Sequence, residues 1–292
     1  MLKLPRILVA TDFSPGSNAA VDRAVHLSAV HGASLHLLHA FDVIAWHRVE
    51  GAFDSERMAI DPPPDVRMQR RLADWAASLA EQIGLKVEAH FGVGPPQRVI
   101  EAYVKAHAIT LVVVGSRADP AVSGLGSTAS KLVRSPACPI LIVRGAESRS
   151  YEAVLSAIDL RKGSDRPLDF ALSLFPSAHH HLLYAFEQTL DPLRVSGFDN
   201  ELIEKILGSM HAKAAAELEQ LARSLSARTV HPVVADVADD VPARAILVCA
   251  ADLPADCVVV GHHGPGADNE GFLGNIAQHV IQYTTRDVLV VP

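Results

Sequence analysis

The sequence predicts an α/β protein built from two tandem copies of one open parallel-sheet domain. Short runs of β-branched residues alternate with longer segments of helical period, and the whole pattern recurs once along the chain. The length of 292 residues agrees with two units, because domains of about 150 residues are common. We therefore place the two domains at residues 1–146 and 147–292.

The duplication is visible as four segments that return in the same order at an offset of 145 to 148 residues. The matching pairs are 6–12 with 153–159, 37–42 with 182–187, 111–116 with 257–262, and 139–143 with 287–291. An offset this constant indicates two copies of one domain, joined near residues 145–150.

In the first copy, near-continuous apolar runs predict strands that are buried on both faces, as in a parallel sheet. The segments between them have helical period, and Ser14 followed by Pro15 is a helix-start signal. The expected strands lie near 6–10, 34–40, 85–90, 110–115 and 139–143, and the expected helices at about 15–31, 65–83, 95–107 and 124–135.

The second copy repeats this alternation. Segment 200–227 carries leucine, isoleucine and methionine at near-helical spacing, so one face of a long helix should pack on the sheet. The expected strands lie near 153–158, 180–186, 229–235, 256–260 and 287–291, and the expected helices at about 164–174, 200–227, 242–251 and 271–284.

Composition excludes several classes of protein. With 49% apolar, 20% charged and 5% aromatic residues, the chain is neither disordered, collagen-like nor a coiled coil. It has no run near the ~20 apolar residues that a membrane helix needs and no signal-peptide core at its start. We expect a cytoplasmic protein without a membrane partner. Its three cysteines, with no Cys-x-x-Cys pair, predict reduced thiols.

The formal net charge of -7 is unevenly distributed: residues 1–146 carry +2 and residues 147–292 carry -9. Neither half has the basic stripe that is typical of a nucleic-acid binder, so we expect no nucleic-acid partner. The first half tolerates an anionic ligand better than the second does.

In an open parallel sheet, ligands bind beyond the carboxyl ends of the strands, where the strand order reverses. Asp12 and Asp159 end the first strand of each copy, and Ala40 and Ala185 lie at the end of the second. A carboxylate there can accept hydrogen bonds from a base or ribose, or it can cap the following helix. Both roles are open at this point.

A glycine-bearing loop follows the fourth strand of each copy. Glycines allow backbone N–H groups to approach a phosphate, and a hydroxyl at the helix start adds a donor; alternatively, a tight turn simply needs small residues. The loop residues that would serve a phosphate are Gly115, Arg117, Gly126, Ser127 and Thr128 in the first copy, and Gly261, Gly264, Gly274 and Asn275 in the second.

Together these motifs resemble the universal stress protein family. The resemblance rests on Val9-Ala-Thr-Asp-Phe-Ser-Pro-Gly-Ser17, on Val114-Gly-Ser-Arg117, on the Leu125-Gly-Ser-Thr128 segment and on Ser135-Pro-Ala-Cys-Pro-Ile-Leu-Ile-Val143. The segment 273–281, Leu-Gly-Asn-Ile-Ala-Gln-His-Val-Ile, is similar to tandem, E-type members. The resemblance covers residues 4–144 and 151–292.

The resemblance implies Rossmann-like domains with five strands in the order 3-2-1-4-5, paired through their fifth strands as a pseudo-dimer within one chain, with a homodimer of chains left open. It also implies an adenine nucleotide, ATP or a relative with Mg, bound by the motif Gly-x2-Gly-x9-Gly-Ser/Thr. Neither copy matches that motif fully. The first has Ala118 for the second glycine and a shorter loop, whereas the second has Asn275 and two carboxylates, Asp268 and Glu270, inside the loop.

Other chemistry is weakly supported. The chain has no Walker loop, no His-Glu-x-x-His and no Gly-x-Ser-x-Gly elbow. Four histidines have two possible roles. They are either ordinary surface residues or, together with Asp159, ligands of a metal ion at the carboxyl edge of the sheet. The stretch 46–64 is a long connection that forms either a lid or a packing flap. The four histidines are His179, His181, His262 and His263.

Three functional classes follow. The first is a stress-response binding or regulatory protein that holds a nucleotide in at least one domain and is not an enzyme. A slow nucleotide hydrolase is the second, ranked lower because only Asp12, Asp159 and histidines stand near the loops as bases. The third is a binder of an apolar or metal ligand with no nucleotide site.

Overall fold

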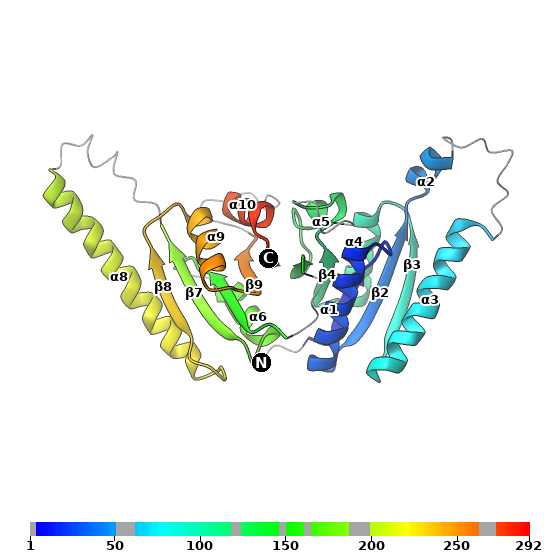
Figure 1. The fold of residues 1–292 in the computed structure, drawn as a ribbon, viewed down its shortest axis with the longest axis horizontal. Helices are drawn as coiled ribbons and strands as arrows, with labels where there is room; N and C mark the ends of the chain where they lie inside the picture. The colour runs from blue at the N-terminus through cyan, green and yellow to red at the C-terminus, as the bar shows by residue number, and fades with distance from the viewer. Residues whose placement is uncertain are drawn as a thin grey trace. The chain divides into compact units, whose positions relative to one another are not determined.

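The computed structural model describes residues 4–50, 62–117, 124–145, 150–160, 165–186, 199–262 and 273–292. The chain divides into two compact units, one at Lys3–Ser150 and the other comprising Tyr151–Pro292. Each unit alternates strands with helices, as Figure 1 shows by colour along the chain.

The first unit contains five strands in the order of the chain. They are β1 (Arg6–Ala10), β2 (Ser34–Phe41), β3 (Val87–Val93), β4 (Leu111–Gly115) and β5 (Ile140–Val143). Its helices are α1 (Pro15–His31), α2 (Val43–Glu50), α3 (Pro64–Ile83), α4 (Pro96–His107) and α5 (Ser127–Leu132).

The second unit repeats this plan. Its strands are β6 (Ala153–Ala157), β7 (His179–Ala185), β8 (Val234–Ala238), β9 (Cys257–Gly261) and β10 (Asp287–Val291). Its helices are α6 (Asp165–Leu174), α8 (Asn200–Ser226), α9 (Pro242–Asp252) and α10 (Asn275–Tyr283).

The predicted sheet is confirmed in both units. The strand order is β3-β2-β1-β4-β5 in the first and β8-β7-β6-β9-β10 in the second, and every neighbouring pair within a unit runs parallel. Both orders are 3-2-1-4-5 when the strands are numbered within their own unit. The order reverses between the first and fourth strands, so a cleft is expected at their carboxyl ends.

Helices cover both faces of each sheet, which explains the continuous apolar runs of the strands. In the first unit α1 and α3 contact each other over one face, and α4 and α5 contact each other over the other. In the second unit α6 packs on β9 and β10, α8 on β7 and β8, while α9 and α10 contact each other. The central strands β1 and β9 are fully buried except at their ends.

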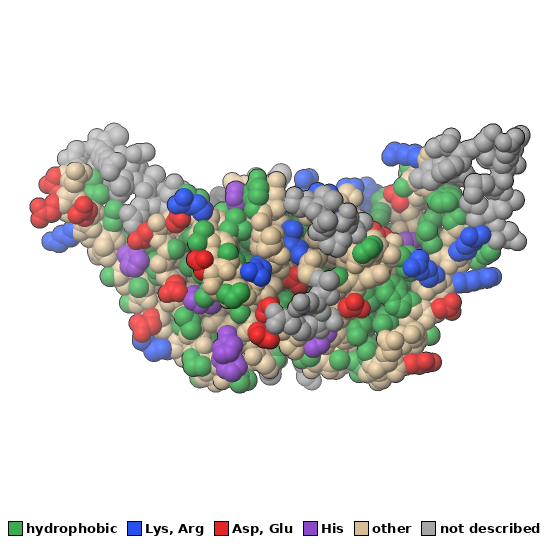
Figure 2. Space-filling view, viewed as in Figure 1, with side chains coloured by type: hydrophobic (Ala, Val, Ile, Leu, Met, Phe, Trp, Pro, Cys, Tyr) green, Lys and Arg blue, Asp and Glu red, His purple; other side chains and the backbone are tan. Residues whose placement is uncertain are grey.

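Helix caps follow the sequence signals where these were clear. Ser14 caps α1, its side chain accepting from the backbone N–H of Ser17, and proline occupies the first turn. Asp199 caps α8 in the same way, and Glu201 and Glu204 follow it. Figure 2 shows acidic side chains at this end of α8, where the helix dipole favours negative charge.

Two strands and two helices differ from the sequence prediction, and one of these helices, α5, covers only Ser127–Leu132 of the predicted 124–135. Strand β8 begins at Val234 rather than near 229, because Thr229 closes the end of α8 by bonding to the His231 carbonyl. Strand β3 runs on to Val93, since its pairing with β2 extends to Phe41. The short helix α2 lies in the connection predicted as a lid or flap, where Trp46 contacts Phe41. Residues 51–61 of that connection lie outside the described residues.

In the part of the chain that the structure describes, no helix is long and apolar enough to cross a membrane.

Candidate functional site

A cavity of about 220 Å³ opens at the carboxyl ends of β1, β2 and β4 in the first domain. It lies at the strand-order reversal, where a ligand of an open parallel sheet is expected. All seven first-domain candidates line it: Asp12, Ala40, Gly115, Arg117, Gly126, Ser127 and Thr128. The structure therefore brings together, in one cavity, residues that are spread over more than a hundred positions of sequence.

Gly115 allows the start of α1 to approach the end of β4. A Cβ atom at this position would lie 2.5 Å from the carbonyl oxygen of Gly16, and real Cβ atoms do not approach a backbone atom so closely. The glycine therefore has a packing reason to be here, in addition to any contact with a ligand.

Hydroxyl groups surround Asp12 at one end of the cavity. Both the backbone N–H and the hydroxyl of Ser14 donate to its Oδ1, and the Ser17 hydroxyl lies 3.0 Å from that of Thr11. Partial burial acts to raise the pKa of Asp12, but hydrogen bonds from Ser14 and Ser17 outweigh it, so the pKa is lowered. At neutral pH Asp12 is a charged acceptor that faces the cavity.

Arg117 supplies the positive charge at the loop end of the cavity. Its Nε atom is buried and has no hydrogen-bond partner among the described residues. Its guanidinium packs over Gly124, where a Cβ atom would lie 3.2 Å from a terminal nitrogen and where φ is +92°. A buried N–H without a partner is unfavourable, so Arg117 is suited to receive an anionic acceptor.

Gly126 joins this end of the cavity to α5. Its N–H donates to the Ser116 carbonyl over 2.5 Å, which fixes the position of Ser127 and Thr128 in the first turn of the helix. That turn has no side-chain cap among the described residues, and Ser127 and Thr128 both line the cavity.

Several lining residues were not identified from the sequence. The sequence predicts Ser14 only as a helix start and Ser17 only as part of the family motif, although the recurrence of hydroxyl residues directly after the Asp12 strand was a usable signal. The apolar wall from α4 carried no sequence signal. The lining residues outside the seven candidates are Ala10, Thr11, Ser14, Ser17, Leu38, Pro96, Ile100, Val114, Ser116 and Ala129.

The second domain places its candidates at the equivalent positions. Asp159 follows β6, Ala185 ends β7 and Gly261 ends β9. Gly274 caps α10 and donates to the His262 carbonyl over 2.8 Å, as Gly126 does to Ser116, and Asn275 begins that helix. Gly264 and the loop carboxylates Asp268 and Glu270 lie outside the described residues.

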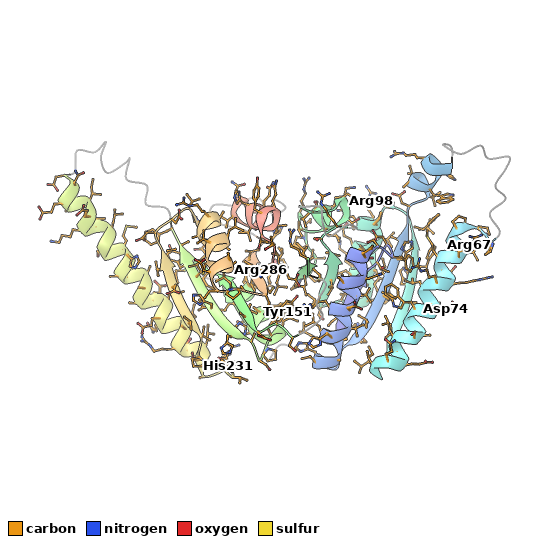
Figure 3. All side chains as sticks on the ribbon, viewed as in Figure 1. Arg67, Asp74, Arg98, Tyr151, His231 and Arg286 are labelled. Carbon is orange, nitrogen blue, oxygen red and sulfur yellow. The ribbon has the colours of Figure 1, made fainter. Side chains whose placement is uncertain are left out.

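The histidines considered as metal ligands do not converge. His179 begins β7 and stacks on His231 at 3.8 Å between ring centroids, at the end of the unit where Figure 3 labels His231. His181 pairs with Asp236 at 2.7 Å, whereas His262 follows the carboxyl end of β9. Strands β7 and β9 are both parallel to β6, so His179 and His262 lie at opposite ends of the sheet. His179 therefore cannot share an ion with His262 at the carboxyl edge. A site of His262 with Asp159 stays a prediction, and His263 lies outside the described residues. No group of three or more metal-ligating side chains is found among the residues that the structure describes.

The fold and this cavity define a class: a tandem α/β protein of two parallel five-stranded sheets, with a cavity at the strand-order reversal of its first half. The model of the universal stress protein family matches residues 3–144 and 150–292. The chain therefore belongs to the universal stress protein family, as a tandem member with two such domains.

Individual relatives agree with this assignment. The chain is 31% identical over 148 residues to universal stress protein YxiE of Bacillus subtilis, which covers 48% of this chain and 98% of that protein. It is 28% identical over 302 residues to a universal stress protein of Mycolicibacterium smegmatis, covering 98% of this chain and 96% of the relative. The crystal structure of a universal stress protein from Archaeoglobus fulgidus superposes with a TM-score of 0.68 at 18% identity, covering 99% of both chains.

Proposed function

We propose that the chain is a tandem universal stress protein whose first domain binds an adenine nucleotide, ATP or a close relative, and acts as a ligand-binding regulatory protein. The observation that carries this proposal is the meeting of Asp12, Arg117 and the Ser127–Thr128 hydroxyls around one cavity. The cavity lining thus combines an anionic acceptor with cationic and hydroxyl donors.

These two kinds of group suit the two parts of a nucleotide, the nucleoside and the phosphates. Ionised Asp12 can accept hydrogen bonds from a ribose hydroxyl or a base amine, but it repels phosphate. Arg117 can donate to phosphate oxygens through a guanidinium whose Nε is otherwise unpaired among the described residues. Mg2+ would bind together with the phosphates, and the hydroxyl oxygens of Ser127 and Thr128 are of the kind that can coordinate it.

Sequence differences between the domains favour the first as the nucleotide site. Ile158 stands where the first domain has Thr11, and Asn275 stands where it has Ser127. The second half also carries a net charge of -9 against +2 for the first, which opposes a polyanionic ligand.

The proposal is tested by titrating ATP, ADP and AMP into the protein, with and without Mg2+, in a calorimeter. Arg117→Gln should weaken the binding of the phosphorylated ligands by roughly ten- to a hundred-fold, as expected for lost hydrogen bonds between charged groups. Arg67→Gln is the matched control, because it makes the same charge change on an exposed part of α3 (Figure 3) outside the cavity lining.

No heat of binding for any of these nucleotides, together with no nucleotide released from the protein as purified, would refute the proposal. Equal weakening by Arg117→Gln and Arg67→Gln would show that the site lies elsewhere.

A regulatory role is proposed in preference to nucleotide hydrolysis. Asp12 is the one carboxylate among the described lining residues, and its Oδ1 already accepts two hydrogen bonds from Ser14. Incubating the protein with ATP and measuring free phosphate separates the two roles. Nucleotide that is retained without phosphate release supports the regulatory role, and sustained release that is lost in Asp12→Asn supports the hydrolase.

A further inference from the structure

The wall of the cavity at Thr11 and Asp12 is held from the opposite side of the sheet. His39 lies on β2 between Leu38 and Ala40, two residues that line the cavity. Successive side chains of a strand point to opposite faces, so His39 points toward the face covered by α1 and α3. There its ring contacts Phe13 at 4.9 Å and Phe91 of β3 at 5.7 Å between centroids.

His39 is fixed in one tautomer by its hydrogen bond. Its Nδ1 lies 2.7 Å from the carbonyl oxygen of Thr11, and since a carbonyl only accepts, Nδ1 carries the proton and donates it. Nε2 is buried and has no partner among the described residues, and the side chain is 6% exposed. Burial lowers the pKa of His39, so the ring is neutral near pH 7.

Phe13, the residue that follows Asp12, has a backbone conformation that residues other than glycine rarely adopt. Its φ is +62°, and a non-glycine residue in this region costs about 1–3 kcal/mol unless its surroundings hold it there. Its ring contacts His39 and also Trp75 of α3 at 6.0 Å, while the Arg71 guanidinium lies 4.4 Å from its centroid. Its N–H donates to the Thr11 hydroxyl over 2.9 Å.

The second domain serves as an internal comparison, because it keeps the backbone hydrogen bond and has a tyrosine in place of the histidine. Ile158 N–H donates to the Leu183 carbonyl over 2.9 Å, as Thr11 N–H donates to that of Leu38 over 2.8 Å. Tyr184 stands in place of His39, and with Ile158 it packs against the apolar core. The sheet edge therefore forms without the histidine, whose bond to Thr11 belongs to the first domain alone.

We propose that His39 is a positioning residue of the first-domain ligand site: by holding the Thr11 carbonyl and packing on Phe13, it fixes the direction in which Asp12 presents its carboxylate to the ligand. This inference rests on the proposed nucleotide site. His39 does not touch the ligand, because its side chain lies on the far face of the sheet.

The test is a double-mutant cycle with ATP as the probe. His39→Phe keeps the ring contacts but removes the donor, and we expect it to weaken ATP binding about ten-fold, the equivalent of one hydrogen bond at the site. In the Asp12→Asn background the same change should have less than about a two-fold effect, since interacting residues are non-additive. His39→Asn, which returns an N–H near the Thr11 carbonyl, should restore most of the affinity.

A second readout needs no ligand. Asp12 owes its lowered pKa to the hydrogen bonds from Ser14 and Ser17, which depend on the direction of its side chain. In His39→Phe the pKa of Asp12, measured by NMR on the carboxyl carbon, should rise toward its ordinary value. Phe13→Gly, which tolerates the positive φ but loses the ring contacts, should shift it in the same direction if His39→Phe does not fold. Tyr184→Phe in the second domain is the matched control and should leave both ATP affinity and the pKa of Asp12 unchanged.

The two proposals fail in different ways. If the unmutated protein binds none of ATP, ADP and AMP and releases no nucleotide as purified, the proposed function is wrong, and the pKa of Asp12 still decides the role of His39. If the pKa of Asp12 is the same in His39→Phe, Phe13→Gly and the unmutated protein, or if His39→Phe weakens ATP binding equally in the Asp12→Asn background, His39 does not position Asp12.

Discussion

At the scale of single residues, Gly115 is required by close packing of the backbone in the first domain. The Gly16 carbonyl occupies the space next to Gly115 that any side chain would need. The start of α1 therefore packs directly against the end of β4. The sequence offers two interpretations of Gly115, close approach to a phosphate or a tight turn that needs a small residue. The structure adds a steric requirement that holds whether or not a ligand is present.

Gly115→Ala should therefore destabilise the first domain by about 1–3 kcal/mol, the usual cost of forcing an extra carbon into a packed site. Gly145→Ala is the control, because no atom lies within 4 Å of the Cβ it would add. Urea unfolding followed by far-UV circular dichroism measures both. Equal midpoints for the two variants would contradict the steric argument.

Among the secondary-structure elements, α4 carries a group of aromatic and titratable side chains against the sheet. Tyr103 stacks on His107 at 3.8 Å and contacts His90 at 4.4 Å. Its hydroxyl lies 2.9 Å from Nδ1 of His36 on β2. Burial lowers the pKa of His36 although Glu88 opposes this, and burial together with His107 lowers that of His90.

These shifts make stability depend on pH in one direction. A histidine whose folded pKa lies below the ordinary value of 6.5 is protonated first in the unfolded chain. Its contribution to stability is complete above pH 6.5 and is lost as the pH falls from there toward the folded pKa. The lowered pKa of Glu88 acts below its ordinary value of 4.5 and so lies outside this window.

We expect the free energy of unfolding to fall between pH 7.5 and pH 5.5, the range that spans the histidine titration. His36→Gln, which keeps a polar side chain and cannot titrate, should reduce the size of this fall. His47→Gln, at an exposed position on α2, should not. Urea unfolding at the two pH values gives the comparison, and an equal fall in all three proteins would contradict the assignment to His36.

Predicted strand boundaries were wrong where contacts with a neighbouring helix, rather than local composition, determine the backbone conformation. Residues 229–233 have the β-branched composition of a strand, but Thr229 bonds to the His231 carbonyl and the Val233 N–H donates to Ser226 of α8. Gly92 pairs with Ala40 within β3, beyond residue 90, where the sequence predicts the end of that strand. A Cβ atom there would lie 2.2 Å from Val99, so close packing of α4 explains the glycine. Local composition does not reveal such contacts.

Over the whole molecule, two copies of one fold have diverged in chemistry. The first keeps Thr11, Arg117 and Ser127 around its cavity, whereas the second has Ile158 and Asn275 at matching positions and a far more acidic half. The pairing of the domains through their fifth strands stays a prediction from the family resemblance.

The stoichiometry of binding follows from this divergence. Calorimetric titration should give one nucleotide per chain, and Arg117→Gln should weaken that single event. Asn275→Ala in the second domain should leave it unchanged. Two equal binding events per chain, or loss of binding in Asn275→Ala, would contradict the assignment of the site to the first domain.

The sequence by itself determined the duplication, the fold class, the 3-2-1-4-5 order through the family resemblance, and seven residues of the cavity. These follow from hydrophobic period and from motifs, which are local along the chain. The tertiary structure alone decided that Ser14 and Ser17 surround Asp12, that Arg117 has an unpaired buried Nε among the described residues, and that His39 supports the Thr11 turn from the other face of the sheet. Each of these depends on side chains from separate strands and helices that meet in space, and a hydrogen bond across a sheet leaves no periodic signal in the sequence.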